Sequence, residues 1–340
     1  MVLSYYSNYP LYNFIWWILK IFRHQKKIVL YCEDAFDWEL FRNVGKYLPP
    51  ISIIAKNRRV QKQLKKLGCI NVGIMPSYPD VVIMFRTMAW KFPCSKIIKI
   101  GFKHGAFNFK AHSKAKYYDL FNVFFLTSSA EVKRVQQLGV KTKLYAEYPK
   151  IDTLFVNGVL APLVKPSIKK PITTLLFTAT WDGSGMSAIN KWYDQFSTLK
   201  EKYRILVTVH EWTSFKYIKV LKENKELFFI DEYDRLKYIQ QTDICIVDTS
   251  SIIAECCLLD RPLIAFRTSE TKRTLPEIRD LIAKIALSVD SFGELEQAIK
   301  TYQQNPTLLA KERKEAAELF FGSPDGQAGR RAADIIKQYC

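Results

Sequence analysis

The sequence predicts an α/β protein with two parallel-sheet domains, and three observations lead to this prediction. Short apolar runs alternate with helical patterns along most of the chain. Strands interleaved with helices are typical of parallel sheets whose faces the helices cover. A stretch without clear periodicity that contains several prolines, from 148 to 171, interrupts the alternation near the middle. The chain has 340 residues, which is too long for one ordinary core and suits about two domains.

The first half contains six apolar runs that we expect to form buried strands. Their predicted ranges are 28–31, 51–55, 71–75, 81–85, 97–102 and 121–126, the last being the final clear strand of this half. Helices are predicted at 36–48, 59–67 and 128–138. Ser128 or Ser129 is the expected N-cap of the third helix, and Gly139 is its expected stop.

The second half repeats the same alternation. Its predicted strands are 174–177, 204–209, 227–230, 244–247 and 263–266, and its predicted helices are 188–202, 215–222, 235–241 and a short one that runs through 259. Two further helices are predicted at 308–319 and 327–338. We therefore assign 27–158 to an N-terminal α/β domain, 159–322 to a C-terminal α/β domain, and 323–340 to a helix that packs back across both.

Residues 1–26 form a separate segment ahead of the first strand. Its apolar run, 11–22, contains Trp16 and Trp17 and is followed by basic residues. The run is shorter than the about 20 residues that span a bilayer. Interfacial aromatics and positive charges predict a short amphipathic helix that lies in an anionic membrane surface. A helix packed on the domain, or one that binds a partner, is the alternative. No cleavable signal peptide is predicted.

Composition limits the class of protein and of partner. Hydrophobic residues make up 48% of the chain, so we expect a packed globular protein and not a disordered one. The formal net charge is +18, which attracts polyanions such as nucleic acid, anionic lipid, a phosphate-rich polymer or a nucleotide. The charge does not choose among these partners, and solubility alone is the plainer explanation. No nucleic-acid motif such as an RNP box is present.

Several common chemistries lack their sequence patterns. The seven cysteines are scattered and include no C-x-x-C pair, so neither a zinc site nor a disulfide framework is indicated. They are expected to be buried thiols in a reducing compartment. No pair of His, Asp or Glu residues shows convincing metal-ligand spacing. The dinucleotide, P-loop and G-x-S-x-G patterns are also absent.

A turn of small hydroxyl residues follows the predicted strand 244–247. Asp248, Thr249, Ser250 and Ser251 occupy this turn, and a short helix begins directly after it. Hydroxyl groups and unsatisfied backbone N–H groups at a helix start together favour an anion. The alternative is that Ser250 or Ser251 acts only as an N-cap.

Two of the four histidines end predicted strands. His104 follows the strand 97–102, between Lys103 and Gly105, where the glycine would allow close approach of a ligand. Imidazole suits removal of a hydroxyl proton near neutral pH, although a hydrogen-bonded core histidine is the alternative. His210 ends the strand 204–209 and could hold a phosphate oxygen, or be an ordinary loop residue. The other two, His24 and His112, are expected at the surface.

Several short blocks between 96 and 338 together resemble the CDP-glycerol glycerophosphotransferase family, the teichoic-acid primase and polymerase type. The blocks occur in the family's order, which is more specific than any block alone. They are Lys103-His104-Gly105, Tyr148-Pro149-Lys150-Ile151-Asp152, Thr178-Ala179-Thr180-Trp181, His210, the run from Thr242 to Glu255, Arg261-Pro262 and Asp325-Gly326-Gln327-Ala328.

The resemblance implies a glycosyltransferase-B-like fold, in which two Rossmann-like domains face a central cleft. It implies that the domain 27–158 binds the acceptor and that the domain 159–322 binds the CDP-activated donor. It implies His104 as the catalytic base, with Lys103, Gly105 and Asp248 in acceptor or supporting roles. The resemblance also implies a set of donor- and phosphate-binding residues. These are Thr180, His210, Thr249, Ser250, Ser251, Glu255 and Arg261, of which Glu255 could instead brace the turn.

The implied reaction is transfer of glycerol phosphate, or a related polyol phosphate, from a CDP-activated donor to a hydroxyl of a cell-surface polymer or lipid-linked acceptor. CMP would be released, without a bound metal and without a cofactor. The protein would lie peripherally on the cytoplasmic face of the cell membrane. A glycosyltransferase of the same fold that uses a nucleotide sugar, in capsule or surface-polysaccharide synthesis, is the alternative. A non-catalytic protein that binds nucleic acid or membrane is the third hypothesis, and nucleic acid is not expected as a partner.

Overall fold

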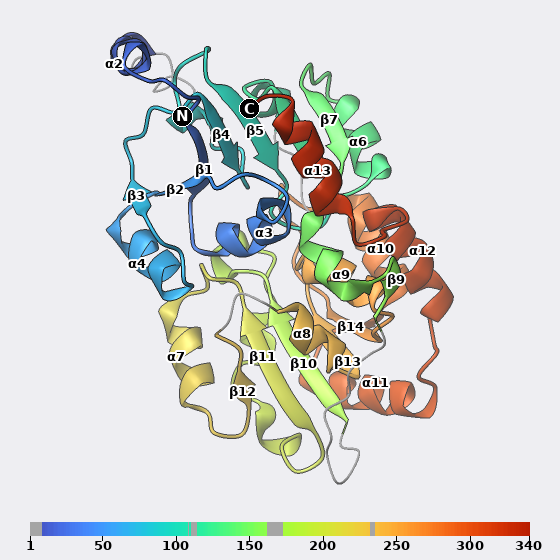
Figure 1. The fold of residues 1–340 in the computed structure, drawn as a ribbon. Coiled ribbons are helices and arrows are strands. Elements are labelled where there is room, and N and C mark those ends of the chain that lie inside the picture. The colour runs from blue at the N-terminus through green and yellow to red at the C-terminus, as the bar shows by residue number, and fades with distance from the viewer. Residues whose placement is uncertain (1–8, 108, 110–113, 162–172, 232–234) are drawn as a thin grey trace. The chain divides into compact units, whose positions relative to one another are not determined.

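The computed structural model describes residues 9–107, 109, 114–161, 173–231 and 235–340 (Figure 1). The chain divides into two compact units. Unit 1 comprises Met1–His104, His112–Leu160 and Phe321–Cys340, and unit 2 comprises Gly105–Ala111 and Ala161–Phe320. Each unit contains one parallel sheet, so the predicted α/β class is confirmed. His112 and residues 1–8 of the predicted interface segment lie outside the described residues.

Unit 1 is built on a seven-stranded sheet in the order β3-β2-β1-β4-β5-β6-β7. Its strands are β1 (Ile28–Cys32), β2 (Ser52–Ala55), β3 (Val72–Ile74), β4 (Val81–Met84), β5 (Ile98–Phe102), β6 (Val123–Leu126) and β7 (Lys143–Ala146). All neighbouring pairs run parallel. The first six match predicted strands, whereas β7 lies beyond the strand predicted as the last. Its side chains are exposed or half-buried, so it lacks the apolar run that marks a central strand.

Helices cover the sheet of unit 1 and follow the predicted pattern closely. They are α2 (Tyr9–Ile21), α3 (Phe36–Gly45), α4 (Arg58–Lys66), α5 (Ala115–Tyr118), α6 (Ser129–Gln136) and α13 (Ala328–Lys337), with 3-10 turns η1 (Ala89–Lys91) and η2 (Pro149–Leu154) and a hairpin, β8 (Phe155–Val156) and β9 (Val159–Leu160). Ser128 is the N-cap of α6, because its hydroxyl accepts a hydrogen bond from the Glu131 N–H at 3.2 Å. Gly139 has a positive φ of 75° and lies beyond the helix end.

The start of α13 is held in unit 1 by two of the blocks that carry the family resemblance. The Asp152 carboxylate accepts hydrogen bonds from the N–H groups of Gly329 at 2.7 Å and Ala328 at 3.3 Å. A Cβ on Gly329 would lie 2.4 Å from the carbonyl oxygen of Asn43, so α13 approaches α3 too closely for any side chain there. Burial raises the pKa of Asp152 to about 6 despite those two N–H donors. The blocks around 150 and 326 therefore stabilise the packing of the C-terminal helix.

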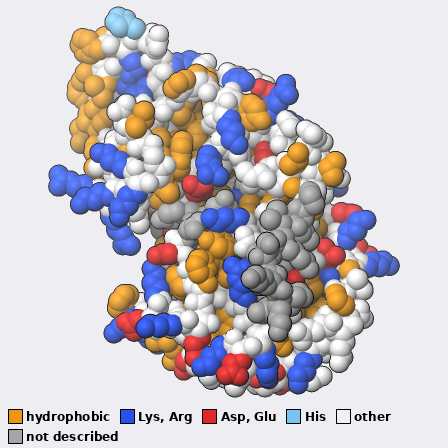
Figure 2. All heavy atoms as spheres, turned by 60° about the horizontal axis from the view of Figure 1, so that its bottom comes forward, with side chains coloured by type: hydrophobic (Ala, Val, Ile, Leu, Met, Phe, Trp, Pro, Cys, Tyr) orange, Lys and Arg blue, Asp and Glu red, His pale blue; other side chains and the backbone are white. Residues whose placement is uncertain are grey.

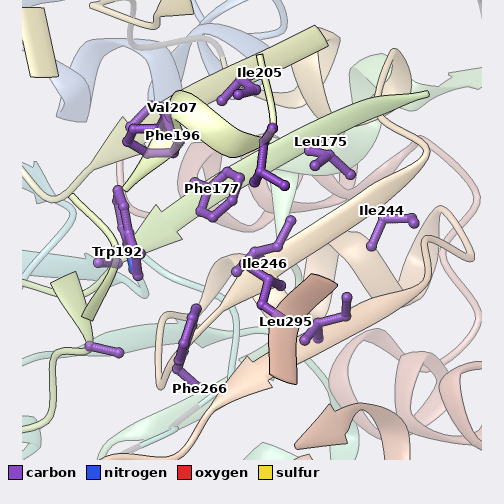
Figure 3. Close-up of a cluster of buried hydrophobic side chains, with 14 of the residues drawn as sticks. Leu175, Phe177, Trp192, Phe196, Ile205, Val207, Ile244, Ile246, Phe266 and Leu295 are labelled. Atoms are coloured by element: carbon purple, nitrogen blue, oxygen red, sulfur yellow. The ribbon is translucent and has the colours of Figure 1, made fainter. Parts of the chain in front are cut away.

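Unit 2 is built on a six-stranded parallel sheet in the order β12-β11-β10-β13-β14-β15. Its strands are β10 (Thr174–Ala179), β11 (Arg204–Val209), β12 (Phe228–Phe229), β13 (Ile244–Val247), β14 (Leu263–Phe266) and β15 (Leu287–Val289). Figure 3 shows the core on one face of this sheet, where Phe177 of β10 meets the aromatic rings of Trp192 and Phe196. The ring centroids of Phe177 and Phe196 lie 5.0 Å apart, edge to face.

The helices of unit 2 include one clear departure from prediction. They are α7 (Phe215–Glu223), α8 (Leu236–Gln240), α9 (Ile252–Leu258), α10 (Pro276–Ile285), α11 (Phe292–Gln304) and α12 (Ala310–Phe321), the last residue of which belongs to unit 1. The helix predicted at 188–202 is wrong: only the 3-10 turns η4 (Ile189–Lys191) and η5 (Phe196–Thr198) form there. Trp192, Phe196 and Leu199 are buried at spacings of three and four, which successive tight turns produce as well as a helix does.

Candidate functional site

The carboxyl edge of the unit 2 sheet gathers most of the predicted donor-binding residues. Thr180 follows β10, His210 follows β11, and Asp248 begins the hydroxyl turn after β13. β11 and β13 both pair with β10, one on each side and in parallel, so the carboxyl ends of the three strands share one edge of the sheet. Ligands of open parallel sheets bind at this edge, which makes it the candidate donor site.

Asp248 fixes the backbone of this edge. Its side chain is buried, at 2% exposure. The N–H of Thr180 donates to both carboxylate oxygens at 3.0 Å, and the N–H of Ala188 donates to Oδ2 at 3.1 Å. These hydrogen bonds join the turn after β13 to the loop after β10. They also supply the donors that a buried carboxylate needs. Its geometry is that of a supporting residue.

The hydroxyl turn itself is arranged around α9. The Thr249 hydroxyl donates to the carbonyl oxygen of Met186 at 3.1 Å. Ser251 is the residue before α9, and among the described residues its side chain makes no capping hydrogen bond to that helix. The Ser251 hydroxyl instead lies against Gly105, where a Cβ would be only 3.0 Å from its oxygen. The N-cap-only hypothesis for Ser251 therefore lacks the hydrogen bond that defines it.

His210 is held by its own loop. Its Nδ1 accepts a hydrogen bond from the N–H of Trp212 at 3.1 Å. In the neutral imidazole the proton is then on Nε2, which makes Nε2 the donor that a phosphate oxygen requires. The His210 ring lies 5.3 Å from the Trp212 ring, which in turn meets Trp181 edge to face at 5.8 Å.

The loops after β10 and β11 are tied to each other by Asp182. Its carboxylate accepts hydrogen bonds from the Ser214 hydroxyl and from the Ser214 N–H, the latter at 2.8 Å. Burial alone would raise the pKa of Asp182, but these hydrogen bonds outweigh it and lower the pKa. Gly183 makes room for the indole of Trp181, because a Cβ there would lie 2.4 Å from that ring. The glycine at 183 therefore serves packing of the aromatic pair.

The structure does not bring Arg261 to this edge. Arg261 precedes β14, so it lies at the amino edge of the parallel sheet, opposite the ends where Thr180 and His210 lie. It is buried, and its Nη2 donates to the carbonyl of Gln240 at 3.2 Å. Burial lowers the pKa of its guanidinium. The prediction that Arg261 binds the donor is therefore corrected: strand direction separates the residue from the others. Glu255 is also buried, within α9, as a bracing residue would be.

A cavity of about 350 Å³ opens beside the hydroxyl turn in unit 2. This volume is in the range of small-molecule sites. Asp248 and Thr249 line one part of it, and residues of β14, of the loop after β14 and of α10 line much of the rest. Its apolar lining comes from Phe109, Met186, Ala265, Phe266, Leu275, Ile278, Ile282 and Ala283. Sequence reasoning missed this cavity, because the loop after β14 carries no motif and α10 was not predicted.

In unit 1, Lys103 and His104 come directly after β5, at the carboxyl edge of that sheet. His104 is exposed. The Lys103 ammonium lies 3.4 Å from a carboxylate oxygen of Glu131, which is completely buried. Glu131 also accepts hydrogen bonds from the N–H and the hydroxyl of Thr127, both at 3.0 Å. Sequence reasoning missed Glu131, although the Ser128-x-x-Glu131 capping pattern could have indicated it.

No group of three or more His, Cys, Asp or Glu side chains in the described part of the chain is placed to hold a metal ion. Across the same residues, no helix combines the length and the apolar character needed to cross a membrane.

Comparison with known proteins gives a family and a fold. The family model for CDP-glycerol:poly(glycerophosphate) glycerophosphotransferase matches residues 112–338. Among curated proteins, none matches the chain. A variant of the wall teichoic acid polymerase TagF is similar in structure, with a TM-score of 0.69 and 13% identity over 99% of this chain and 96% of that one. A TagF variant soaked with CDPG is also similar, with a TM-score of 0.64 and 14% identity over the same shares of the two chains.

A sugar-nucleotide enzyme shares the fold as well. The UDP-GlcNAc 2-epimerase of Methanocaldococcus jannaschii, in complex with UDP-GlcNAc and UDP, has a TM-score of 0.55 and 14% identity over 92% of this chain and 99% of its own. At these identities the structural likeness shows the fold, and it agrees with the glycosyltransferase-B-like class that the sequence predicts.

Proposed function

The chain belongs to the CDP-glycerol:poly(glycerophosphate) glycerophosphotransferase family, and we propose that it transfers glycerol phosphate, or a related polyol phosphate, from a CDP-activated donor. The acceptor is a hydroxyl group of a teichoic-acid-type polymer or of a lipid-linked precursor, and CMP is released. The observation that carries this proposal is the carboxyl edge of unit 2. There the hydroxyl turn lines a cavity of about 350 Å³, and His210 follows a strand at the same edge of the sheet, an arrangement that suits a nucleoside diphosphate.

In the proposed reaction, the donor diphosphate lies at the hydroxyl turn. The N–H groups and hydroxyls of Ser250 and Ser251 and the Nε2–H of His210 are hydrogen-bond donors for its oxygens. The nucleoside occupies the cavity beside Thr249. These groups would stabilise the negative charge on the transferring phosphoryl group.

His104 is the proposed general base. It takes the proton of the acceptor hydroxyl, whose oxygen forms a bond to the β-phosphorus of the donor. The bond between this phosphorus and the bridging oxygen breaks, and the bridging oxygen leaves on CMP. Gly105, the residue after His104 in the sequence, lies against Ser251 within unit 2, which supports placing the base near the diphosphate site. Phosphoryl transfer depends mainly on position and charge stabilisation, which these groups could provide.

A donor panel tests the function. Purified protein incubated with a lipid-linked or polymeric glycerol phosphate acceptor is expected to release CMP from CDP-glycerol or CDP-ribitol. It is expected to release no UDP from UDP-sugars. Addition of EDTA is expected to leave the CMP rate unchanged, because the proposed charge stabilisation uses protein groups alone. Release of UDP with sugar transfer would support the nucleotide-sugar glycosyltransferase instead, for which the epimerase fold is the structural precedent.

We further propose that α2 holds the protein peripherally at an anionic membrane surface. One face of α2 is fixed to unit 1: Trp16 Nε1 donates to the carbonyl of Pro79 at 2.7 Å, and the Tyr12 hydroxyl donates to the carbonyl of Ser77. Apolar side chains remain exposed on the other face, and Figure 2 shows hydrophobic side chains gathered over α2. They are Leu11, Phe14, Trp17 and Ile21, and the exposed Phe22 follows directly after the helix. Exposed Lys20 and Lys26 lie at the end of this helix or just beyond it, where anionic headgroups would attract them.

The double substitution Phe14→Glu and Trp17→Glu is expected to weaken binding to phosphatidylglycerol vesicles by about tenfold or more, because it places two charges on the inserting face. Vesicle co-sedimentation measures this, with phosphatidylcholine vesicles as the neutral comparison. Ile70→Glu is the matched control, since Ile70 is an exposed apolar residue of unit 1 outside α2. Equal binding by the double variant and the wild type would exclude this role for α2.

A further inference from the structure

We propose that Glu270 and Arg279 recognise the cytosine base of the donor and discriminate against uracil. The inference rests on the proposed function, since it assumes that a nucleoside diphosphate occupies the cavity of unit 2. Both side chains line that cavity, as does Thr249 of the hydroxyl turn. A nucleotide with its phosphates at that turn would therefore have its base among residues of the loop after β14 and of α10.

The cavity has the two kinds of surface that a pyrimidine needs. Side chains such as Phe266 and Ile278 give an apolar lining for the faces of the ring. Glu270 and Arg279 add an acceptor and a donor, which are joined as an ion pair between the Glu270 carboxylate and Nη1 of Arg279. The Nε of Arg279 is 3.3 Å from an Asp280 oxygen, which helps to orient the guanidinium plane.

The hydrogen-bond acceptor and donors of this pair match those of cytosine. Cytosine presents a donor, the N4 amino group, beside two acceptors, N3 and O2. A carboxylate can accept from N4, as acidic side chains do when they read cytosine in DNA, while a guanidinium can donate to N3 and O2. Uracil presents O4 and N3–H at these positions. Its O4 would face the carboxylate and its N3–H would face the guanidinium, so both contacts would be repulsive.

Both side chains are more than half exposed before a ligand binds, at 53% for Arg279 and 68% for Glu270. An exposed ion pair contributes little to stability, so its loss is not expected to prevent folding. A pair of base contacts of this kind discriminates by about 10- to 100-fold. Substitutions in this ion pair should therefore change the ratio of CDP to UDP affinity and leave the stability of the fold nearly unchanged.

The test measures the dissociation constants of CDP and UDP for the full chain by titration calorimetry. Wild-type protein is expected to bind CDP about tenfold or more tightly than UDP. Glu270→Gln is expected to bring the two affinities close together, because an amide can accept from N4 of cytosine or donate to O4 of uracil. Arg279→Lys is expected to weaken CDP binding, because lysine lacks the two-pronged donor. Glu315→Gln is the matched control: Glu315 of α12 pairs with Lys284 of α10, the helix that carries Arg279, and Glu315 does not line the cavity.

An unchanged ratio of CDP to UDP affinity in Glu270→Gln, or a wild-type ratio near one, would overturn this assignment. Either result could occur while CDP-glycerol still supports CMP release, and then only the assignment of the base contacts fails. Conversely, a large ratio that Glu270→Gln abolishes would support the assignment. If CDP-glycerol then gave no CMP with any acceptor, the proposed transfer reaction alone would fail.

Discussion

Replacing His104 with alanine is expected to lower the rate of CMP release by about 100- to 10,000-fold, the contribution typical of a positioned general base. The substitution removes the proposed proton acceptor and keeps every side chain that is proposed to bind the donor in unit 2. His104 is exposed, so the loss of its imidazole is not expected to change the free energy of unfolding substantially. CDP binding should therefore persist while turnover is lost.

The measurement is the initial rate of CMP release with CDP-glycerol and an acceptor, together with the melting temperature and the affinity for CDP. His24→Ala is the matched control, since His24 is an exposed histidine of unit 1 outside the proposed site. Wild-type turnover in the His104 variant would end its assignment as the base. Loss of turnover with a lowered melting temperature would point to misfolding, and His104→Gln would then show whether a polar side chain restores the fold without the activity.

The parallel sheets could be predicted because a strand that is buried on both faces consists mainly of apolar residues, which form a short apolar run in the sequence. β1, β4 and β13 have almost completely buried side chains, so each appears in the sequence as a short hydrophobic block. β7 is an edge strand with exposed residues and gives no such signal. The segment 188–202 gives a misleading helix signal, since its buried residues are spaced three and four apart but only 3-10 turns form there.

The candidate site could be predicted only where a residue's position along its strand was known. Thr180 and His210 directly follow strands, and parallel pairing of those strands places both residues at one edge without further information. Arg261 shares a block with Pro262 in the sequence, but the two residues precede β14, and so Arg261 lies at the other edge. The contact between Asp152 and Gly329 joins residues separated by 177 positions, and no local pattern predicts it.

Asp248→Ala is expected to destabilise unit 2 strongly. The Asp248 carboxylate is buried and accepts hydrogen bonds from the N–H groups of Thr180 and Ala188. Alanine would leave both N–H groups without this acceptor, at a cost of about 1–3 kcal/mol each. A cavity would add to this loss. We expect the free energy of unfolding to fall by about 3–5 kcal/mol, as measured by urea denaturation.

The same substitution should also weaken CDP binding, because Asp248 holds the loop that carries Thr180 against the hydroxyl turn. Asp243→Ala separates the two effects. Asp243 accepts a hydrogen bond from the N–H of Thr174 at 2.8 Å, but it lies before β13, at the amino edge of the sheet. It should cost stability and leave the CDP affinity of the folded protein unchanged. If Asp248→Ala behaved in the same way, with normal CDP affinity, the hydroxyl turn could not be the place where the donor diphosphate is held.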